Sequence, residues 1–230
     1  MSRGGNQTIR SPYSAAFTAA SMMYREMTAL IPLMQDPQAA ALLSQEIEEN
    51  RLLCIHSLTS RKRVVTELQR RYNAVPSAFW DHYRLLSEPA QRVALFYVLL
   101  KTYQLLFDVH ICVTLSLWRS ASTELQNSDV MLYLNELASQ DPFVDSWTEA
   151  TRKKVTTVYL LMLHQAGLMK ADSASLCQPD IDDNDWMYYI RIVRHGFSKP
   201  ASCPLTVSTN SNRKPDENDD RRTTVRETLQ

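Results

Sequence analysis

Glycine is scarce in this 230-residue chain, which contains only four glycines. Two of them, Gly4 and Gly5, lie close to the N-terminus, so that Gly167 and Gly196 are the only glycines in the rest of the chain. Tight β-hairpins usually require glycine or asparagine at positive φ, and phosphate-binding loops require glycines at fixed spacing. The scarcity argues against a β-rich fold and excludes the GxGxxG and GxxxxGK[ST] loops.

Uninterrupted apolar runs are also missing. The stretch MSRGGNQTIRSPY at the N-terminus has no apolar segment of the kind that a signal peptide needs. Residues 92–118 are long enough to cross a bilayer, but Lys101, Gln104, Asp108 and His110 interrupt them. A charge near the bilayer centre costs about 2.5–3.5 kcal/mol. We therefore predict a long buried helix here, and a cytoplasmic protein without membrane contact.

The residue patterns of catalytic and metal sites do not occur. The four cysteines form no CxxC pair, the five histidines are scattered, and no G-x-S-x-G motif is present. We therefore expect no enzymatic activity, no cofactor and no bound metal.

The chain does contain one helical pattern after another. Proline or a capping residue marks most starts, and apolar residues recur at helical spacing. A stripe of Val64, Leu68 and Tyr72 defines a third helix, and Ser146 with Glu149 fits a capping box for a late one, which Gly167 would end. The predicted helices cover residues 12–31, 37–56, 58–72, 76–86, 87–120, 128–139, 146–169 and 183–195.

This pattern predicts an all-α fold, a compact globular multi-helix bundle with helix-turn-helix-like elements. One domain is expected over residues 11–197, and a division into sub-domains 11–86 and 87–197 stays open. Residues 1–10 are expected to be flexible. The polar tail over 198–230 has too few large apolar residues to offset its ordering entropy, so we predict that it is disordered.

The most informative feature is the distribution of basic residues. The chain has a formal net charge of zero, yet residues 58–72 hold five basic residues and one acid. Residues 60–66 (SRKRVVT) are echoed by residues 151–157 (TRKKVTT). A chance similarity is the alternative to a true repeat, and both stay open.

Both clusters lie near predicted helix starts. If Thr59 or Ser60 caps the helix over 58–72, residues 61–63 fall in its first turn. Positive charge there opposes the helix dipole and costs about 0.3–1 kcal/mol. Free backbone N–H groups at a helix start also bind anions, so we predict contacts with phosphate. A solvated helix face is the alternative. The later cluster, followed by Gly167 and LMKADSASL, is similar to half of a helix-turn-helix or winged helix.

An ordered set of segments resembles the BrxA family. The segments are SPYSAAFT, ENRLL, TSRKRVVTELQRRY and SWTEATRKKVTTVYLLMLHQAGLM, and the resemblance covers about residues 11–195. BrxA is the small helical component of BREX (bacteriophage exclusion) systems. The resemblance implies a cytosolic, non-enzymatic, all-helical protein that binds double-stranded DNA. It would act beside a methyltransferase, an ATPase, a phosphatase-like protein and an AAA+ protein.

The resemblance also implies which residues contact DNA. The basic helix starts match residues 60–63 and 151–154, and the role extends to nearby basic residues. The expected DNA-binding residues are Ser60, Arg61, Lys62, Arg63, Arg70, Arg71, Thr151, Arg152, Lys153, Lys154 and Lys170. We expect a monomer. Two alternatives remain: an adaptor that docks partner defence proteins, and an RNA binder in the manner of NusB.

Overall fold

A computed structural model describes residues 11–120, 123–185 and 187 of the chain. These residues are helical with short connections, so the all-α prediction is confirmed. The elements are η1 (Ala16–Ala19), α1 (Tyr24–Gln35), α2 (Ala39–Glu49), α3 (Leu58–Tyr72), α4 (Ser77–Tyr83), α5 (Glu88–Thr102), α6 (Gln104–Val109), the π-helical η2 (His110–Thr114), α7 (Leu115–Arg119), α8 (Asn127–Gln140), α9 (Pro142–Asp145) and α10 (Glu149–Gln165).

Three predictions concern residues that lie mainly outside the part of the chain that the structure describes. The flexible segment 1–10 and the disordered tail 198–230 lie outside the described residues. Residues 183–185 and Met187 are helical, as predicted, and the remainder of the predicted 183–195 helix also lies outside the described part.

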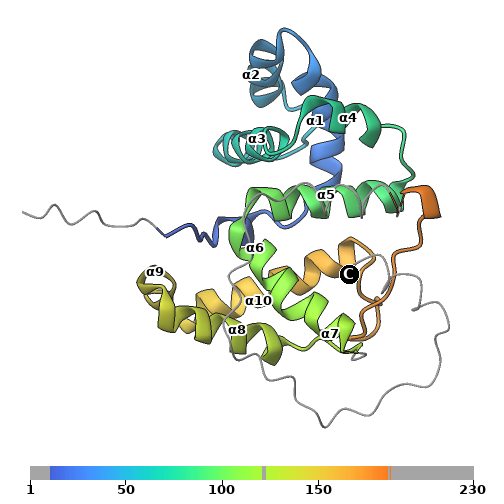
Figure 1. The fold of residues 1–230 in the computed structure, drawn as a ribbon. Coiled ribbons are helices and arrows are strands. Elements are labelled where there is room, and N and C mark those ends of the chain that lie inside the picture. Colours follow the sequence, from blue (N-terminus) through green and yellow to red (C-terminus); the bar gives the residue numbers. More distant parts are fainter. Residues whose placement is uncertain (1–10, 121–122, 186, 188–230) are drawn as a thin grey trace, which may run out of the picture.

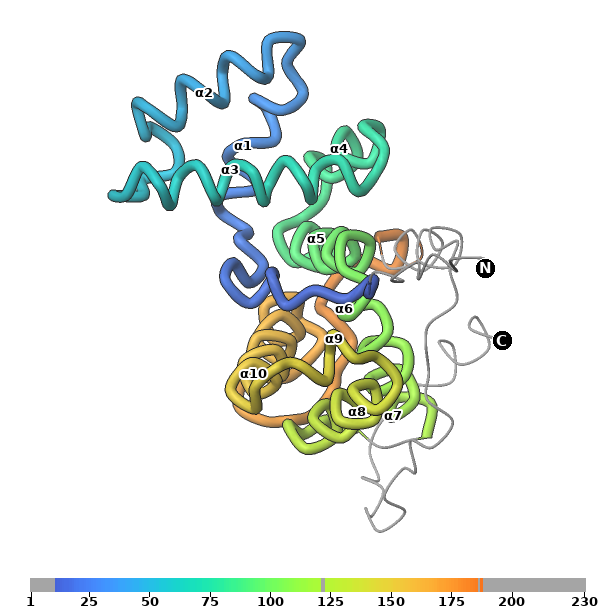
Figure 2. The backbone as a smooth tube through the Cα atoms, turned by 90° about the vertical axis from the view of Figure 1, so that its left-hand side faces the viewer, coloured from blue at the N-terminus to red at the C-terminus, as the bar shows by residue number. Residues whose placement is uncertain are grey.

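Helix α5 lies in the middle of the molecule. Figure 1 shows α1–α4 above α5 and α6–α10 below it, and the turned view agrees (Figure 2). Both α3 and α10 contact α5. Every residue from Val93 to Leu100 is buried, because neighbouring helices cover α5 on opposite sides. The first part of the apolar run over 92–118 therefore belongs to a buried core helix.

The predicted helix over 87–120 is broken at Tyr103. This residue is extended (φ −125°, ψ 108°), and the segment Gln104–Arg119 leaves α5 at a bend of 114°. Contacts from distant parts of the chain hold the break. The Tyr103 hydroxyl donates to Glu67 of α3, and the Phe17 ring packs edge-on against the Tyr103 ring.

No single helix in the described residues is long and apolar enough to cross a membrane. Within the same residues, the bent pair of α5 and Gln104–Arg119 meets the requirements of length and composition when its two parts are taken together.

The predicted first helix, over 12–31, is wrong in its first half. Ser21 (φ 30°) and Met23 (φ 54°) adopt left-handed backbone conformations that end the short η1 before α1 begins. Residues 13–22 instead form a strap across the molecule. The Tyr13 hydroxyl donates to Asp108 in α6 at 3.0 Å, and the Met22 carbonyl accepts from Arg71 in α3 at 2.9 Å. The strap therefore connects the lower helices to the upper ones.

The end of α10 has the predicted form. Gly167 adopts φ 71°, its N–H donates to the His164 carbonyl, and the Leu168 N–H reaches back to the Leu163 carbonyl. These two bonds are those of a Schellman motif, which requires a left-handed residue after the helix. A short hairpin follows, in which Met169 pairs with Leu176.

Helix α10 is anchored by a buried polar group in η2. The Tyr159 hydroxyl contacts Nδ1 of His110 at 3.1 Å and the Thr114 hydroxyl at 2.5 Å. Burial lowers the pKa of His110 to about 4, because the imidazolium would lose its hydration. His110 is therefore neutral in the folded protein near neutral pH.

Candidate nucleic-acid interface

The first basic cluster lies two or three residues deeper in its helix than expected. Ser57 caps α3, and its side chain accepts from the Ser60 N–H at 3.4 Å. The predicted caps, Thr59 and Ser60, are inside the first turn. The Arg61 N–H is already bonded to the Ser57 carbonyl, so the cluster begins where backbone donors are satisfied. We call residues 57–63 the α3 start.

Arg61 faces the backbone of the preceding segment. Its Nε donates to the Ile47 carbonyl at 2.5 Å, and its Nη1 donates to the carbonyls of Ile55 (2.8 Å) and His56 (3.1 Å). One side chain thus joins α3 to the end of α2 and to the connecting loop. Its role is to position the helix start, and this geometry does not support the predicted role as a DNA contact.

The loop between α2 and α3 is fixed from the other side by Glu46. Its carboxylate accepts from the backbone N–H groups of Leu52 at 2.8 Å and Leu53 at 2.9 Å. Asn50, which is left-handed and ends α2, accepts from the Ile55 N–H through its side chain. Glu46 is therefore buried and structural. Because both flanking helices hold the loop, the α3 start is preorganised.

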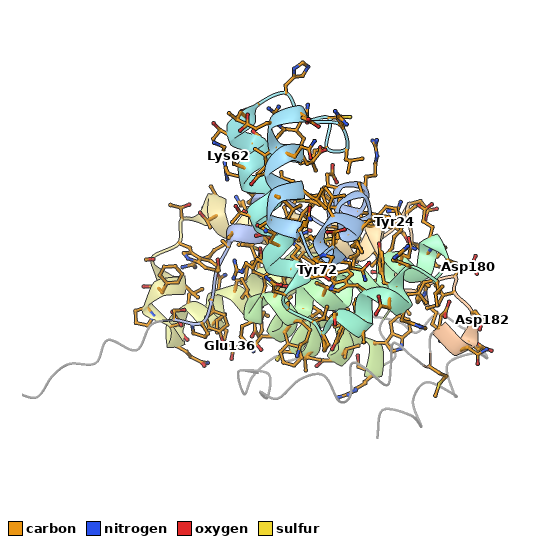
Figure 3. All side chains as sticks on the ribbon, turned by 90° about the horizontal axis from the view of Figure 1, so that it is seen from above. Tyr24, Lys62, Tyr72, Glu136, Asp180 and Asp182 are labelled. Carbon is orange, nitrogen blue, oxygen red and sulfur yellow. The ribbon has the colours of Figure 1, made fainter. Side chains whose placement is uncertain are left out.

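Ser60, Lys62 and Arg63 are exposed at this preorganised start. Lys62 and Arg63 form no ion pair with another residue in the described part of the chain. In Figure 3, Lys62 lies on the opposite side of the view from Asp180 and Asp182. The two cations are thus free to meet a ligand anion.

The two arginines at the C-terminal end of α3 differ in their exposure. Arg70 is exposed, with its guanidinium 4.8 Å from the centre of the Tyr103 ring. Arg71 is only 2% exposed, and its Nε lies 2.7 Å from the Glu67 carboxylate. It belongs to the core with Val65 and Leu68, whereas the predicted stripe residues Val64 and Tyr72 are half-buried. The prediction that Arg71 contacts DNA does not fit this burial.

The second basic cluster has a different cap from the predicted one. Thr148 caps α10 and accepts from the Thr151 N–H at 3.2 Å. The Ser146 hydroxyl instead donates to the Phe143 carbonyl, so the predicted capping box of Ser146 and Glu149 is wrong. We call residues 148–154 the α10 start.

The two helix starts are built in the same register. Counted from their caps, Arg61 and Arg152 occupy the same position, and both bind a backbone carbonyl of the preceding helix. The Thr66 hydroxyl donates to the Lys62 carbonyl at 2.8 Å, and at the equivalent position Thr157 donates to the Lys153 carbonyl at 3.0 Å. The sequence echo therefore corresponds to a repeated local structure.

Acidic neighbours neutralise most of the α10 start. Arg152 donates to the Asp145 carbonyl at 3.0 Å and lies 3.5 Å from the Asp145 carboxylate. Lys153 lies 2.7 Å from Glu149, and this lysine holds the pKa of Glu149 below its usual range. Lys154 is exposed and has no ion pair with a described residue. Among the described contacts, Lys154 is therefore the one cation of the α10 start that is exposed and free of ion pairs, as Lys62 and Arg63 are at α3.

Lys170 lies apart from both clusters. It is exposed at the beginning of the hairpin that follows α10, and its N–H donates to the Ser175 carbonyl. The 17 residues of α10 span about 25 Å, so Lys170 and the α10 start lie at opposite ends of this helix.

A groove beside the α3 start was not predicted. It has a volume of about 480 Å³ and lies between η1 and α3, lined by Ala16, Ala19, Ala20, Ser60, Lys62, Arg63, Val64, Thr66 and Glu67. The alanines are visible in the sequence as SAAFTAA, but no local pattern shows that they meet α3.

Comparisons with known proteins found a family and a solved structure to which the chain is similar. The model of the BrxA family matches residues 11–187. A crystal structure of an uncharacterized protein from Magnetospirillum magneticum is similar over 81% of this chain and 95% of that one, with a TM-score of 0.62 and 19% identity. At that identity the likeness concerns the fold alone. No curated protein matches the chain.

Proposed function

The chain belongs to the BrxA family and is thus a component of a BREX phage-defence system, and we propose that it is the system's non-enzymatic, cytoplasmic double-stranded-DNA-binding component. The α2–α3 unit would act as a helix-turn-helix-like element that presents the α3 start to the DNA backbone.

The observation that carries this proposal is the pair of unpaired cations, Lys62 and Arg63, on a fixed helix start. Arg61 and Glu46 immobilise the loop that precedes them. Fixing a binding segment before association reduces the entropy that binding costs. A helix face that is merely solvated would not need such support, so this geometry favours a binding surface.

The expected mode of binding is contact with phosphates. Lysine and arginine neutralise phosphates and release counterions, which gives affinity with little sequence preference. The proposed contacts are Ser60, Lys62, Arg63 and Arg70 at α3, with Lys154 as a weaker contact at α10. Arg61, Arg71 and Arg152 support the surface from within.

The test is fluorescence anisotropy with labelled duplex DNA, single-stranded DNA and RNA of equal length over a salt series. About three to four engaged phosphates predict a slope of log K against log salt of roughly −2.7 to −3.6 for duplex DNA. Absence of duplex binding at low salt would contradict the proposal. Preferential binding of RNA would favour the NusB-like alternative.

A second candidate function is that of an adaptor within the defence complex. Phe143 in α9 is 50% exposed, and its ring packs edge-on against Trp147 beside the α10 start. Exposed aromatic residues are common at the centre of protein interfaces. Purified BREX components, treated with nuclease, should then bind the wild-type monomer and release a Phe143→Ala variant. Retention of the variant by these components would contradict an adaptor surface at α9.

A further inference from the structure

The groove between η1 and α3 has walls of two different kinds. Three alanines form one wall, which we call the η1 wall: Ala16 and Ala19 of η1 and Ala20 directly after it. The α3 wall carries Ser60, Lys62 and Arg63, and Val64 adds a further apolar surface. A ligand in this groove would meet small apolar groups on one side and cations with a hydroxyl on the other.

The one acidic residue in the groove is already occupied. The Glu67 carboxylate accepts from Nε of Arg71 at 2.7 Å and from the Tyr103 hydroxyl. Its charge is therefore offset by a buried guanidinium, and it does not cancel the charges of Lys62 and Arg63. The groove remains suited to an anionic ligand.

The η1 wall is held in place independently of any ligand. Phe17, next to the groove alanines, is fully buried and packs on Tyr103. The strap is also bonded at its two ends, through the Tyr13 hydroxyl and the Met22 carbonyl. The groove is therefore preformed, as ligand sites usually are.

We propose that this groove takes the sugar–phosphate backbone of one DNA strand, which extends the proposed function and rests on it. Lys62 and Arg63 bind the phosphates, and the Ser60 hydroxyl donates to a phosphate oxygen. Thr66 cannot donate, because its hydroxyl is bonded to the Lys62 carbonyl. The alanine wall packs against the deoxyribose carbons, so the contact reads the backbone and not the bases.

The walls fit a nucleic-acid strand better than a protein segment. Protein interfaces are anchored by large aromatic and aliphatic side chains in fitted pockets, whereas this groove offers only alanines and one valine as apolar surface. Contacts to sugar and phosphate are made by lysine, arginine and serine, and the α3 wall carries one of each.

The experiment fills the groove without changing its charge. Ala19 is exposed, so an Ala19→Phe variant should fold normally and occupy the space that the strand needs. The matched control is Ala41→Phe on the exposed face of α2, outside the groove. Duplex affinity is measured by anisotropy, and the thermal midpoint of each variant is recorded. If Ala19→Phe is destabilised, Ala16→Phe makes the same test from the other exposed alanine.

Ala19→Phe should weaken duplex binding roughly tenfold and flatten its salt dependence, because two phosphate contacts are lost. Ala41→Phe should bind as wild type does. If Ala19→Phe keeps wild-type affinity while Lys62→Ala/Arg63→Ala loses binding, the groove does not hold the DNA strand. The proposed DNA-binding function would then remain intact. No duplex binding by the wild-type protein would overturn both. Binding of poly-glutamate peptide that Ala19→Phe abolishes, with duplex binding unchanged, would assign the groove to an acidic protein segment.

Discussion

The α3 start and the α10 start share their construction and differ in the charge that they present. Each has a hydroxyl cap, an arginine bound to the preceding backbone and two further basic residues in the same positions. The residue after the cap differs. It is Leu58 in α3, and it is Glu149 in α10, where its carboxylate pairs with Lys153. This pairing, together with that of Arg152 and Asp145, leaves less positive charge available at the α10 start.

The buried faces of the two helices differ as well. Counted from the caps, Glu67 and Arg71 of α3 correspond to Val158 and Met162 of α10. The first pair forms a partly buried ionic contact, whereas Met162 is a fully buried apolar residue. A repeated sequence motif thus specifies the local helix start, and the surrounding helices specify its anchoring and net charge.

The largest expected effect concerns this anchoring. Arg71→Ala leaves Glu67 and the Met22 carbonyl without their guanidinium partner, and should lower the free energy of unfolding by about 3–5 kcal/mol. Met162→Ala creates a cavity and should cost about 2–5 kcal/mol. Urea denaturation measures both, with exposed Arg70→Ala as the control. A loss below about 1 kcal/mol for Arg71→Ala would show that the ionic contact is dispensable.

The next largest effect separates the helix starts in DNA binding. Lys62→Ala/Arg63→Ala should weaken duplex affinity by roughly ten- to fiftyfold, because two unpaired cations are lost. The same change at Lys153 and Lys154 should cost only about two- to fivefold, because Glu149 already neutralises one of them. Anisotropy titrations at one salt concentration compare the two. Equal losses would mean that the pairing with Glu149 does not persist in solution.

The two positioning arginines should differ in their contribution to stability. Arg61→Ala leaves three backbone carbonyls without a donor and should cost about 2 kcal/mol, whereas Arg152→Ala should cost about 1 kcal/mol. Lysine cannot form the same fork of hydrogen bonds, so Arg61→Lys should resemble Arg61→Ala. Chemical denaturation gives these differences, and full rescue by lysine would contradict the positioning role.

The last expected effect is a pH dependence of stability on the α10 side. Because the pKa of His110 is lowered to about 4 in the folded protein, the unfolded chain binds more protons between pH 6.5 and pH 4. Stability should therefore fall as the pH decreases through this range, and no further below it. A His110→Gln variant should lose less stability than wild type between pH 7 and pH 5. If urea titrations show that both proteins lose the same free energy of unfolding between pH 7 and pH 5, His110 is not the cause of the pH dependence.

Much of the fold could be predicted from the sequence, because it depends on local patterns. The bounds of α3 and the Schellman end of α10 follow from apolar spacing and from Gly167. The caps could not be predicted reliably, since Ser57, Thr59 and Ser60 all carry hydroxyls and compete for the same role. Their choice depends on how the preceding loop is held.

Residues distant in the sequence determine the break at Tyr103. They also determine which arginines form hydrogen bonds within the protein and which are exposed. Apolar residues continue on both sides of Tyr103, and only Phe17 and Glu67 reveal why the helix stops there. Arg61 and Arg63 occur in the same basic run, yet Arg61 donates to backbone carbonyls and Arg63 is exposed to solvent. Such differences arise from packing and are absent from local patterns.

We propose the α3 start as the principal DNA contact because no acidic residue follows its cap to pair with Lys62. The most direct measurement is the duplex affinity of a Leu58→Glu variant at low salt, with Leu58→Gln as the uncharged control. Leu58 is 39% exposed, so both variants should fold. The account predicts that Leu58→Glu pairs with Lys62 and binds duplex DNA roughly fivefold more weakly, with a flatter salt dependence, whereas Leu58→Gln binds as wild type does. Unchanged affinity in Leu58→Glu would contradict the claim that the α3 start is the principal DNA contact.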